Sequence, residues 1–350
     1  MRKLLNKKFT ILIVLFFIMI ILFIFSLFVG SSKISFSESL NALFGNGQKN
    51  HIIIMQNIRL PRAIAALVVG CGLAVAGLIM QTTLSNEMAS PSTLGVSNAA
   101  TLGANISIIV LAGGFLNTGN NVQNFFNGNN VFSTSLIAFV FSFISVLITL
   151  GLCKIKSFSK ETVILCGVAM AAIWTALTSL IQFYATDVSL SAAIVWSFGD
   201  LARATYQIDL IILIVLLISI TFFSILSNRY NAMLAGDDIA KSVGVNVGRF
   251  RFISLLIASL LTAVCITNIG IIGFVGIICP HIAKKIFGYN HKYTIWGSVL
   301  LGAILLLVSD TLARTVGNGS AIPVGIITSL VGAPFFLYII FRRKRGDKNA

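Results

Sequence analysis

Ten long apolar runs, separated by short polar segments, dominate the hydrophobic pattern of the chain. A helix that crosses a bilayer needs about 20 mostly apolar residues, and most of the runs reach that length. They lie at 9–29, 61–81, 93–112, 134–153, 162–184, 208–226, 252–270, 271–287, 294–315 and 323–341. The pattern therefore predicts an all-α, polytopic membrane protein with about ten transmembrane helices.

The boundary between the seventh and eighth runs is the least distinct, because residues 252–279 are almost continuously apolar. Asn268, Gly270, Gly273 and Gly276 interrupt this stretch, so we place a turn near 268–273. Backbone groups that such a turn frees must be satisfied inside the protein. An irregular segment is therefore expected within the helix bundle.

The distribution of positive charge sets the expected orientation. Ten spans place both termini on one side of the membrane, and 19 of the 25 lysine and arginine residues fall on that side. Cytoplasmic loops carry such an excess, so both termini are predicted to be cytoplasmic. The six exceptions, on the outer side, are Lys33, Lys49, Arg59, Arg62, Arg203 and Arg314.

Composition supports a membrane protein and gives no sign of an enzyme. Only 10% of the residues are charged, against about 25% in soluble domains. The formal net charge of +15 comes from residues at the ends of apolar runs, which is typical of membrane topology and not of nucleic-acid binding. The five cysteines have no paired spacing, and no phosphate-binding or zinc-protease motif is present. We expect one transmembrane domain over 1–350, with no catalytic residue, metal or cofactor.

The stretch NIRLPRAIAALVVG, from Asn57, opens the second run. Arg59 and Arg62 flank Pro61, and proline in the first turn of a helix fixes its local geometry. The two arginines should therefore be held in place. Small residues are dense in the rest of the run, which favours close helix packing in a membrane.

The longest inner loop, NRYNAMLAGDDIAKSVGVNVGRFR, contains the signals of a short helix. Asp237 and Asp238 favour a helix start because acidic side chains complement the macrodipole, and Gly244 favours a stop. We predict a two-turn helix at about 235–244. It could lie on the lipid surface or dock a soluble cytoplasmic partner, and the residues alone favour neither.

Within that loop, AGDDIAKSVGVNVGR resembles the coupling loop of permease subunits from ABC importers for iron siderophores, haem and cobalamin. Other stretches are similar to the same family in the same order, over about residues 55–341. They are NIRLPRAIAALVVGCGLAVAGLIMQ, SNEMASPSTLGVSNAATLGA, GFVGIICPHIAKKIFG, LLGAILLLVSDTLART and IPVGIITSLVGAPFFLYII. The family usually has Asn-Pro after its second helix, where this chain has Asn86-Glu87, so the path of that loop is open.

The resemblance implies an assembly and three groups of site residues. The expected partners are a second permease subunit, two cytoplasmic ATPase subunits, an extracytoplasmic substrate-binding lipoprotein and membrane lipid, in a bacterial cell membrane. Docking of the binding protein falls to Arg59, Arg62 and Arg314. Coupling to the ATPase falls to Ala235, Gly236, Asp237, Asp238, Lys241 and Gly244. The cytoplasmic gate falls to Asn86, Met88, Lys160 and Glu161.

Several alternatives stay open at this point. Iron(III)-siderophore is the first choice of cargo, and haem or cobalamin are the alternatives. An ion-coupled secondary transporter would need ionisable groups at membrane depth, and Asp310 is the one we identify. It precedes Arg314 by four residues, which favours an ion pair within the helix; a role in lining the substrate path is the other possibility.

Overall fold

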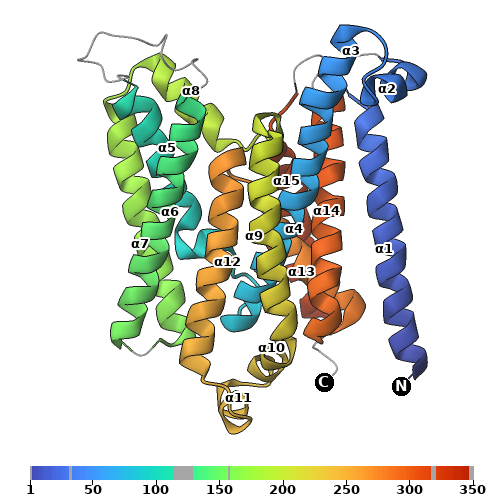
Figure 1. Cartoon of the computed structure of the whole chain (residues 1–350). Helices are drawn as coiled ribbons and strands as arrows, with labels where there is room; N and C mark the ends of the chain where they lie inside the picture. Colours follow the sequence, from blue (N-terminus) through green and yellow to red (C-terminus); the bar gives the residue numbers. More distant parts are fainter. Residues whose placement is uncertain (1, 31–33, 113–128, 157, 317–320, 347–350) are drawn as a thin grey trace.

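The computed structural model describes residues 2–30, 34–112, 129–156, 158–316 and 321–346, and among these residues it contains helices and no strand (Figure 1). Seven helices in the described part of the chain are long and apolar enough to cross a membrane. Shorter apolar helices accompany them at Val96–Leu111, Asp187–Ser197 and Val324–Tyr338. The protein is therefore an all-α, multi-pass membrane protein, as the apolar runs predict.

The elements follow one another in a fixed order along the chain. They are α1 (Arg2–Phe28), α2 (Phe36–Leu43), α3 (Lys49–Ile53), η1 (Ile54–Arg59), α4 (Leu60–Thr83), η2 (Pro91–Leu94), α5 (Val96–Asn105), η3 (Ile106–Leu111), α6 (Asn129–Lys156), α7 (Lys160–Phe183), α8 (Asp187–Ser197), η5 (Leu201–Arg203), α9 (Tyr206–Ile225), α10 (Ser227–Leu234), α11 (Asp237–Ser242), α12 (Val247–Ile269), α13 (Val275–Phe287), α14 (His291–Val316) and α15 (Val324–Gly346).

Each of the ten predicted runs coincides with a helix or, in the third, with α5 and its continuation η3. Helix α1 begins, and α15 ends, at the same end of the bundle, which also carries α10 and α11 (Figure 1). Helix α8 was not predicted, because its residues were assigned to an outer loop. Its 11 residues extend about 16 Å, too short to cross a bilayer.

Helix α4 forms the centre of the bundle and is almost entirely buried against α9, α12, α13 and α14. Its small residues allow this contact. A methyl group on Gly70 would collide with the backbone of Gly302 in α14, and one on Gly77 would collide with Gly276 in α13. Close approach at glycine is how membrane helices gain packing energy without a hydrophobic driving force. The prediction of a tightly packed second helix is confirmed.

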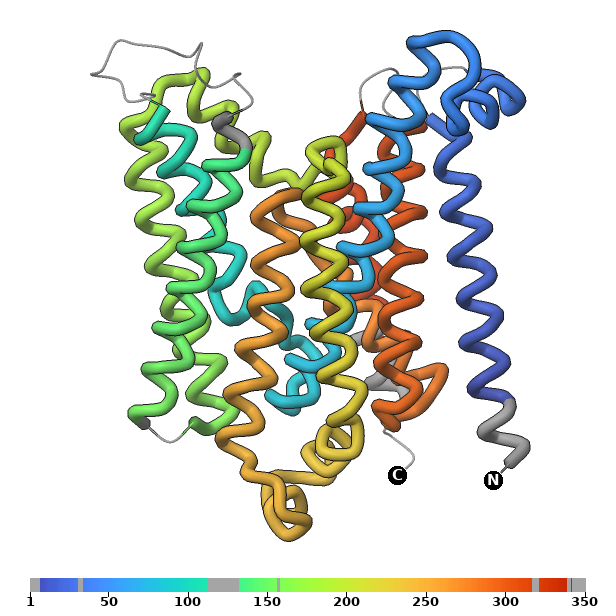
Figure 2. Tube along the Cα trace, viewed as in Figure 1, coloured from blue at the N-terminus to red at the C-terminus, as the bar shows by residue number. Residues whose placement is uncertain are grey.

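The predicted turn between the seventh and eighth runs is also confirmed. Helix α12 ends at Ile269, Gly270 has a φ of +93°, and α13 begins at Val275 (Figure 2). The freed carbonyl of Ile269 accepts a hydrogen bond from the backbone nitrogen of Asp200 at 2.8 Å. Irregular backbone at this depth is thus satisfied within the protein, as the absence of water in a bilayer requires.

Candidate functional site

A cavity of about 180 Å³, partly open to the surface, lies in the bundle where two helices are interrupted. One interruption is the loop after α4 with η2, and the other is the segment between α12 and α13. The cavity is lined by Leu73, Ser90, Pro91, Ser92, Ser97, Thr262, Ile266, Ile271, Ile272, Gly273, Phe274, Gly276 and Ile277, none of them charged. Interrupted helices around an internal site are typical of membrane transporters.

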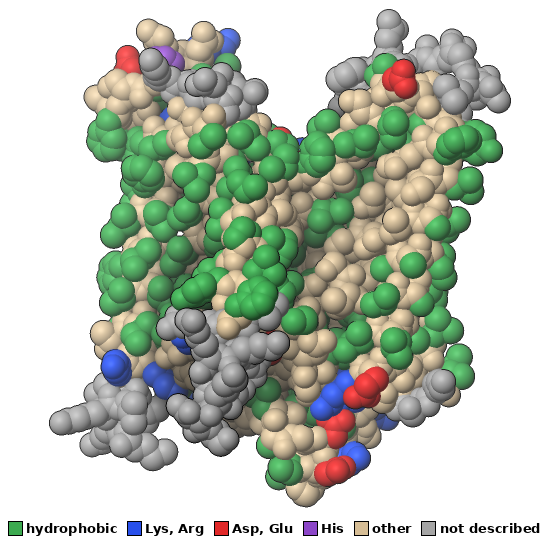
Figure 3. Space-filling model, turned by 180° about the vertical axis from the view of Figure 1, so that it is seen from behind, with side chains coloured by type: hydrophobic (Ala, Val, Ile, Leu, Met, Phe, Trp, Pro, Cys, Tyr) green, Lys and Arg blue, Asp and Glu red, His purple; other side chains and the backbone are tan. Residues whose placement is uncertain are grey.

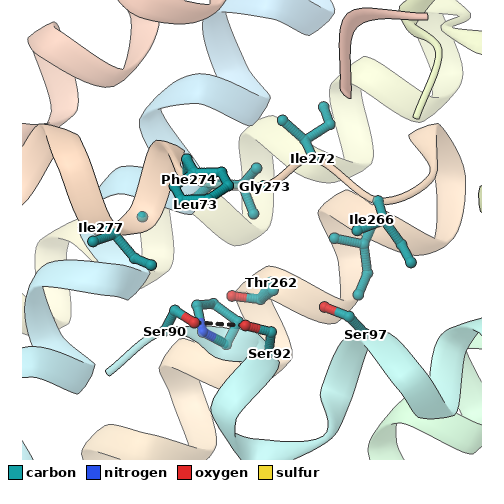
Figure 4. Close-up of a pocket in the computed structure, with 13 residues that line it drawn as sticks. Leu73, Ser90, Ser92, Ser97, Thr262, Ile266, Ile272, Gly273, Phe274 and Ile277 are labelled. Carbon is teal, nitrogen blue, oxygen red and sulfur yellow. Dashed lines mark hydrogen bonds between the residues drawn. The ribbon is translucent and has the colours of Figure 1, made fainter. Parts of the chain in front are cut away.

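The hydroxyl residues gather on one side of this cavity (Figure 4). Ser90, Ser92 and Thr262 lie on one side, with the Ser90 and Ser92 hydroxyl oxygens 2.6 Å apart. Ile272, Gly273 and Phe274 lie across from them. Such a lining offers a few weak hydrogen bonds and an apolar surface, which suits a solute that must pass without tight binding.

Phe274 stands out in the apolar wall because its φ is +65°. A non-glycine residue in this left-handed region costs about 1–3 kcal/mol and persists only where its surroundings fix it. Gly332 in α15 leaves the room that the Phe274 side chain fills, since a methyl group at Gly332 would lie 2.5 Å from Phe274 Cβ. Phe274 was not predicted as a site residue, because its backbone conformation is what distinguishes it and the sequence does not show that.

The loop after α4 has a defined path despite the missing proline. The helix ends in a six-to-one turn, with Ser85 at a φ of +47° and the Asn86 nitrogen bonded to the Gln81 carbonyl oxygen at 3.1 Å. The Asn86 side-chain oxygen then accepts a hydrogen bond from the Met88 nitrogen at 2.9 Å. Asn86 thus organises the loop, and Met88 is half-exposed beyond it.

The four predicted gate residues lie outside the cavity lining. Lys160 begins α7 and lies with its Nζ 3.3 Å from Asp237 Oδ1, while Glu161 is exposed beside it. Asn86 and Met88 lie in the loop between α4 and η2. The structure therefore places none of the four against the cavity, and their gate role stays a prediction.

The predicted helix in the inner loop is confirmed as α11, and α10 precedes it. We call residues 227–242, which form α10 and α11, the coupling segment. Gly236, with a φ of +120°, separates the two helices. Gly244 ends α11 in a Schellman turn, in which the Val245 nitrogen bonds the Ala240 carbonyl at 3.0 Å. Ala235 lies between the helices at the end of α10.

The two adjacent aspartates of α11 have different environments. Asp237 points into the protein, where both its carboxylate oxygens accept from Arg251 Nη2 at 2.9 and 2.8 Å. Burial raises the pKa of Asp237, but hydrogen bonds and charges from Arg251 and Lys160 lower it by more, so it lies below the ordinary value. The Asp238 side chain is 98% exposed and pairs with Lys241 at 3.1 Å. Only Asp238 is free to face a partner.

The exposed surface at α11 and its C-terminal end also contains apolar residues that were not predicted as contacts. Ile239 and Val243 are more than half exposed. An open groove beside the segment is lined by Asn231, Leu234, Ala235, Tyr289 and Asn290. Charged side chains gather at the same end of the molecule (Figure 3). An apolar patch with a charged border is typical of a surface that binds another protein.

At the opposite end of the bundle, the three arginines predicted to dock the binding protein are buried. Arg59, Arg62 and Arg314 are 4%, 4% and 6% exposed. Arg62 Nε lies 2.7 Å from Asp310 Oδ1, and Arg314 Nε lies 3.0 Å from Asp310 Oδ2. The ion pair within α14 is therefore confirmed, and it includes Arg62 from α4 as a second cation.

These arginines also satisfy the last carbonyl groups of α1. Arg59 Nη1 donates to the carbonyl oxygens of Leu27 and Phe28 at 3.1 and 3.3 Å. Arg314 donates to those of Ser26 and Val29 at 2.9 and 3.0 Å. Helix ends leave such carbonyls unpaired, so the arginines attach α1 to the bundle. Docking of a binding protein by them stays a prediction, and it requires release of these partners.

A second acid at membrane depth was missed by the sequence analysis. Asp209, in the first turn of α9, is 3% exposed, and neither carboxylate oxygen has a hydrogen-bond partner in the structure. Its position in the 208–226 run was visible in the sequence. The helix macrodipole favours a negative charge at this position, which gives the residue a structural reason to be there.

The curated relatives of this chain are membrane permeases of nearly the same length. The ABC transporter permease protein MJ0087 of Methanocaldococcus jannaschii is 43% identical over 338 residues, which cover 96% of this chain and 95% of its own. The Fe(3+)-citrate import system permease protein YfmE of Bacillus subtilis is 33% identical, with 94% of each chain covered. The hemin transport system permease protein HmuU of Yersinia pestis is 31% identical, with 94% of this chain and 95% of its own covered.

A similar solved structure agrees with these relatives. It shows a metal-chelate type ABC transporter in an inward-facing conformation, with a TM-score of 0.81, 26% identity and coverage of 95% of this chain and 99% of its own.

An uncharged cavity between interrupted helices, together with a helical segment exposed at one end, is typical of a multi-pass membrane permease. A family model described as the FecCD transport family matches residues 18–342, and the chain belongs to that family. It is thus the permease subunit of an ABC importer, in which ATP hydrolysis is the work of a separate subunit.

Proposed function

We propose that the cargo of this permease is an iron(III)-siderophore. The observation that carries the proposal is the cavity lining, which contains hydroxyl and apolar groups and no charged side chain. A fixed charge would bind a charged chelate tightly and retain it, whereas weak contacts allow release. The relative named for iron citrate supports an iron chelate as the class of cargo.

Haem is the second candidate, and the relative named for hemin transport favours it to nearly the same degree. Its identity of 31% differs little from the 33% of the iron-citrate relative, so overall similarity does not separate the two cargoes. Cobalamin is the third candidate, from the family resemblance alone. An ion-coupled secondary transporter is disfavoured because family membership assigns the energy source to ATP.

We further propose the assembly that the family implies. Two permease subunits would enclose the path, two ATPase subunits would bind beneath them, and a binding lipoprotein would deliver the cargo from outside. The exposed face of α11, with Asp238, Ile239 and Val243, supports the coupling segment as the ATPase contact. Met88 and Lys160, at the same end of the bundle, would belong to the cytoplasmic gate, with Asn86 and Glu161 beside them.

The test of the cargo uses the partner binding protein and the reconstituted importer. Quenching of the binding protein's fluorescence by a panel of ferric siderophores, haem and cobalamin identifies the ligand. Uptake of that ligand into proteoliposomes must then require the ATPase subunit and ATP. We expect a ferric siderophore to bind and to be transported. Binding of haem alone would refute the siderophore, and ATP-independent uptake abolished by a protonophore would refute the importer.

A further inference from the structure

We infer that Arg251 is the positioning residue through which movement of the coupling segment reaches the loop at the cavity. The inference rests on the proposed ATPase contact at α11. Arg251 lies in the first turns of α12, and its side chain is 3% exposed. Arg251 was not predicted as a site residue, because in the sequence it resembles many other basic residues near the inner ends of helices.

All three nitrogens of the Arg251 guanidinium have separate partners. Nη2 donates to the carboxylate of Asp237 in α11 at 2.9 and 2.8 Å, and Nη1 donates to the carbonyl oxygen of Phe158, which precedes α7, at 3.0 Å. Nε donates to the carbonyl oxygen of Thr83, the last residue of α4, at 2.9 Å. One rigid planar group therefore joins three segments that are far apart in the sequence.

The bond to Thr83 completes the end of α4. The last four carbonyl groups of a helix have no partner within it. Here the carbonyls of Met80, Gln81 and Thr82 accept from backbone nitrogens of residues 84–86. The carbonyl of Thr83 accepts from Arg251 instead. Any displacement of the guanidinium is thus applied directly to the point where α4 becomes the loop.

A second connection reaches the neighbouring residue of α4. His291 Nε2 lies 2.8 Å from Thr82 Oγ1, and His291 Nδ1 lies 2.9 Å from Asn231 Oδ1 in α10. His291 is buried, as Arg251 is. The coupling segment is therefore attached to Thr82 through α10 and to Thr83 through α11. Two attachments to consecutive residues fix both the position and the direction of the end of α4.

The loop beyond Thr83 is short and internally bonded. It leads through Asn86, whose side chain and backbone oxygens accept from Met88 and Ala89, to Ser90. Ser90, Pro91 and Ser92 line the cavity. A stiff loop transmits displacement where a flexible one would absorb it, so movement of α11 changes the hydroxyl side of the cavity.

The sharpest test replaces Arg251 with lysine. Lysine keeps the charge but carries one nitrogen in place of the planar group that reaches three partners. The matched control is Arg249→Lys, because Arg249 lies two residues earlier on the same helix and is exposed. Both variants are reconstituted with the ATPase subunit and the binding protein. Cargo transported per ATP hydrolysed is measured, together with the amount of assembled complex.

We expect Arg251→Lys to assemble with the ATPase and to hydrolyse ATP, but to transport about 3- to 30-fold less cargo per ATP. The Arg249→Lys control should match the wild type. A purely structural role would lower hydrolysis and transport together, in proportion to the complex that remains, and would overturn the inference. An unchanged ratio in Arg251→Lys would also overturn it.

A distance measurement tests the transmission itself. A ketone-bearing amino acid is introduced at positions 88 and 155, which are both exposed, and a spin label is attached to each ketone. This chemistry leaves the five cysteines of the chain unlabelled. We expect their separation to depend on ATP in the wild type and in Arg249→Lys, and to lose that dependence in Arg251→Lys. A preserved ATP response in Arg251→Lys would refute the role of Arg251. Failure of the proposed function has a different signature, since the wild type itself would then show no ATP-driven uptake.

Discussion

Replacing Asp310 with asparagine is expected to destabilise the end of the bundle that lies opposite α11. The Asp310 side chain is fully buried and lies between Arg62 and Arg314, whose own side chains are 5% and 6% exposed. Asparagine keeps the size of the side chain and removes its negative charge. Two buried guanidinium groups would then face a neutral amide.

The size of the effect follows from these contacts. Removing one partner of a buried ion pair costs about 3–5 kcal/mol, because the remaining charge stays buried and unpaired. Two features reduce the loss here. Arg314 keeps its bonds to the carbonyl oxygens of Ser26 and Val29, and Arg62 Nη2 still lies 3.6 Å from Asp200. We therefore expect about 3 kcal/mol, a large part of the 5–15 kcal/mol that is typical of a folded protein.

The assay is the melting midpoint of the purified protein in detergent, measured at one scan rate because such unfolding is commonly irreversible. Asp310→Asn should melt well below the wild type. The control is Asp238→Asn, since that side chain is 98% exposed and an exposed pair contributes only about 0–1 kcal/mol. If Asp310→Asn melts like the wild type but no longer supports uptake, the carboxylate acts on the cargo and the structural argument fails.

Three further outcomes are expected. Arg59→Glu combined with Arg62→Glu should abolish uptake and lower the melting midpoint, because the new carboxylates face the carbonyl end of α1 and Asp310. If the midpoint is unchanged and reversed charges on the binding protein restore uptake, the two arginines dock that protein instead. Asp238→Lys should reduce the ATPase subunit retained by the affinity-purified permease, and full retention with normal transport would exclude this contact. The attachment of α11 by Asp237 should persist from neutral to mildly acidic pH, because its pKa lies below the ordinary value. This attachment should be lost only as the pH falls below about 3.9, the pKa of an unperturbed aspartate. The measurement is hydrogen exchange of the α11 amides, and an exchange rate that has already increased at pH 6 would contradict the prediction.

The membrane class, the positions of the long helices and the family were predictable from the sequence. These properties follow from local signals: the length of each apolar run, the glycines that end one helix before another begins, and the acids and glycine that bound α11. The turn after Ile269 and the helix at 237–242 were both predicted because backbone conformation there depends on residues close in the chain. The short helix α8 was not predicted because its run of 11 residues is too short to indicate a membrane-spanning helix.

Which charged residues face water and which are bonded inside the protein could not be predicted from the sequence, because it depends on how the helices pack. Arg59, Arg62 and Arg251 each follow the same local pattern of a basic residue near a helix end, yet all three are buried, and each has a partner between 14 and 248 residues away. Asp237 and Asp238 are adjacent and chemically identical, but one binds Arg251 and the other is exposed. Such differences depend on how helices pack against one another, because a buried guanidinium is stabilised where that packing supplies a carboxylate or a free carbonyl group.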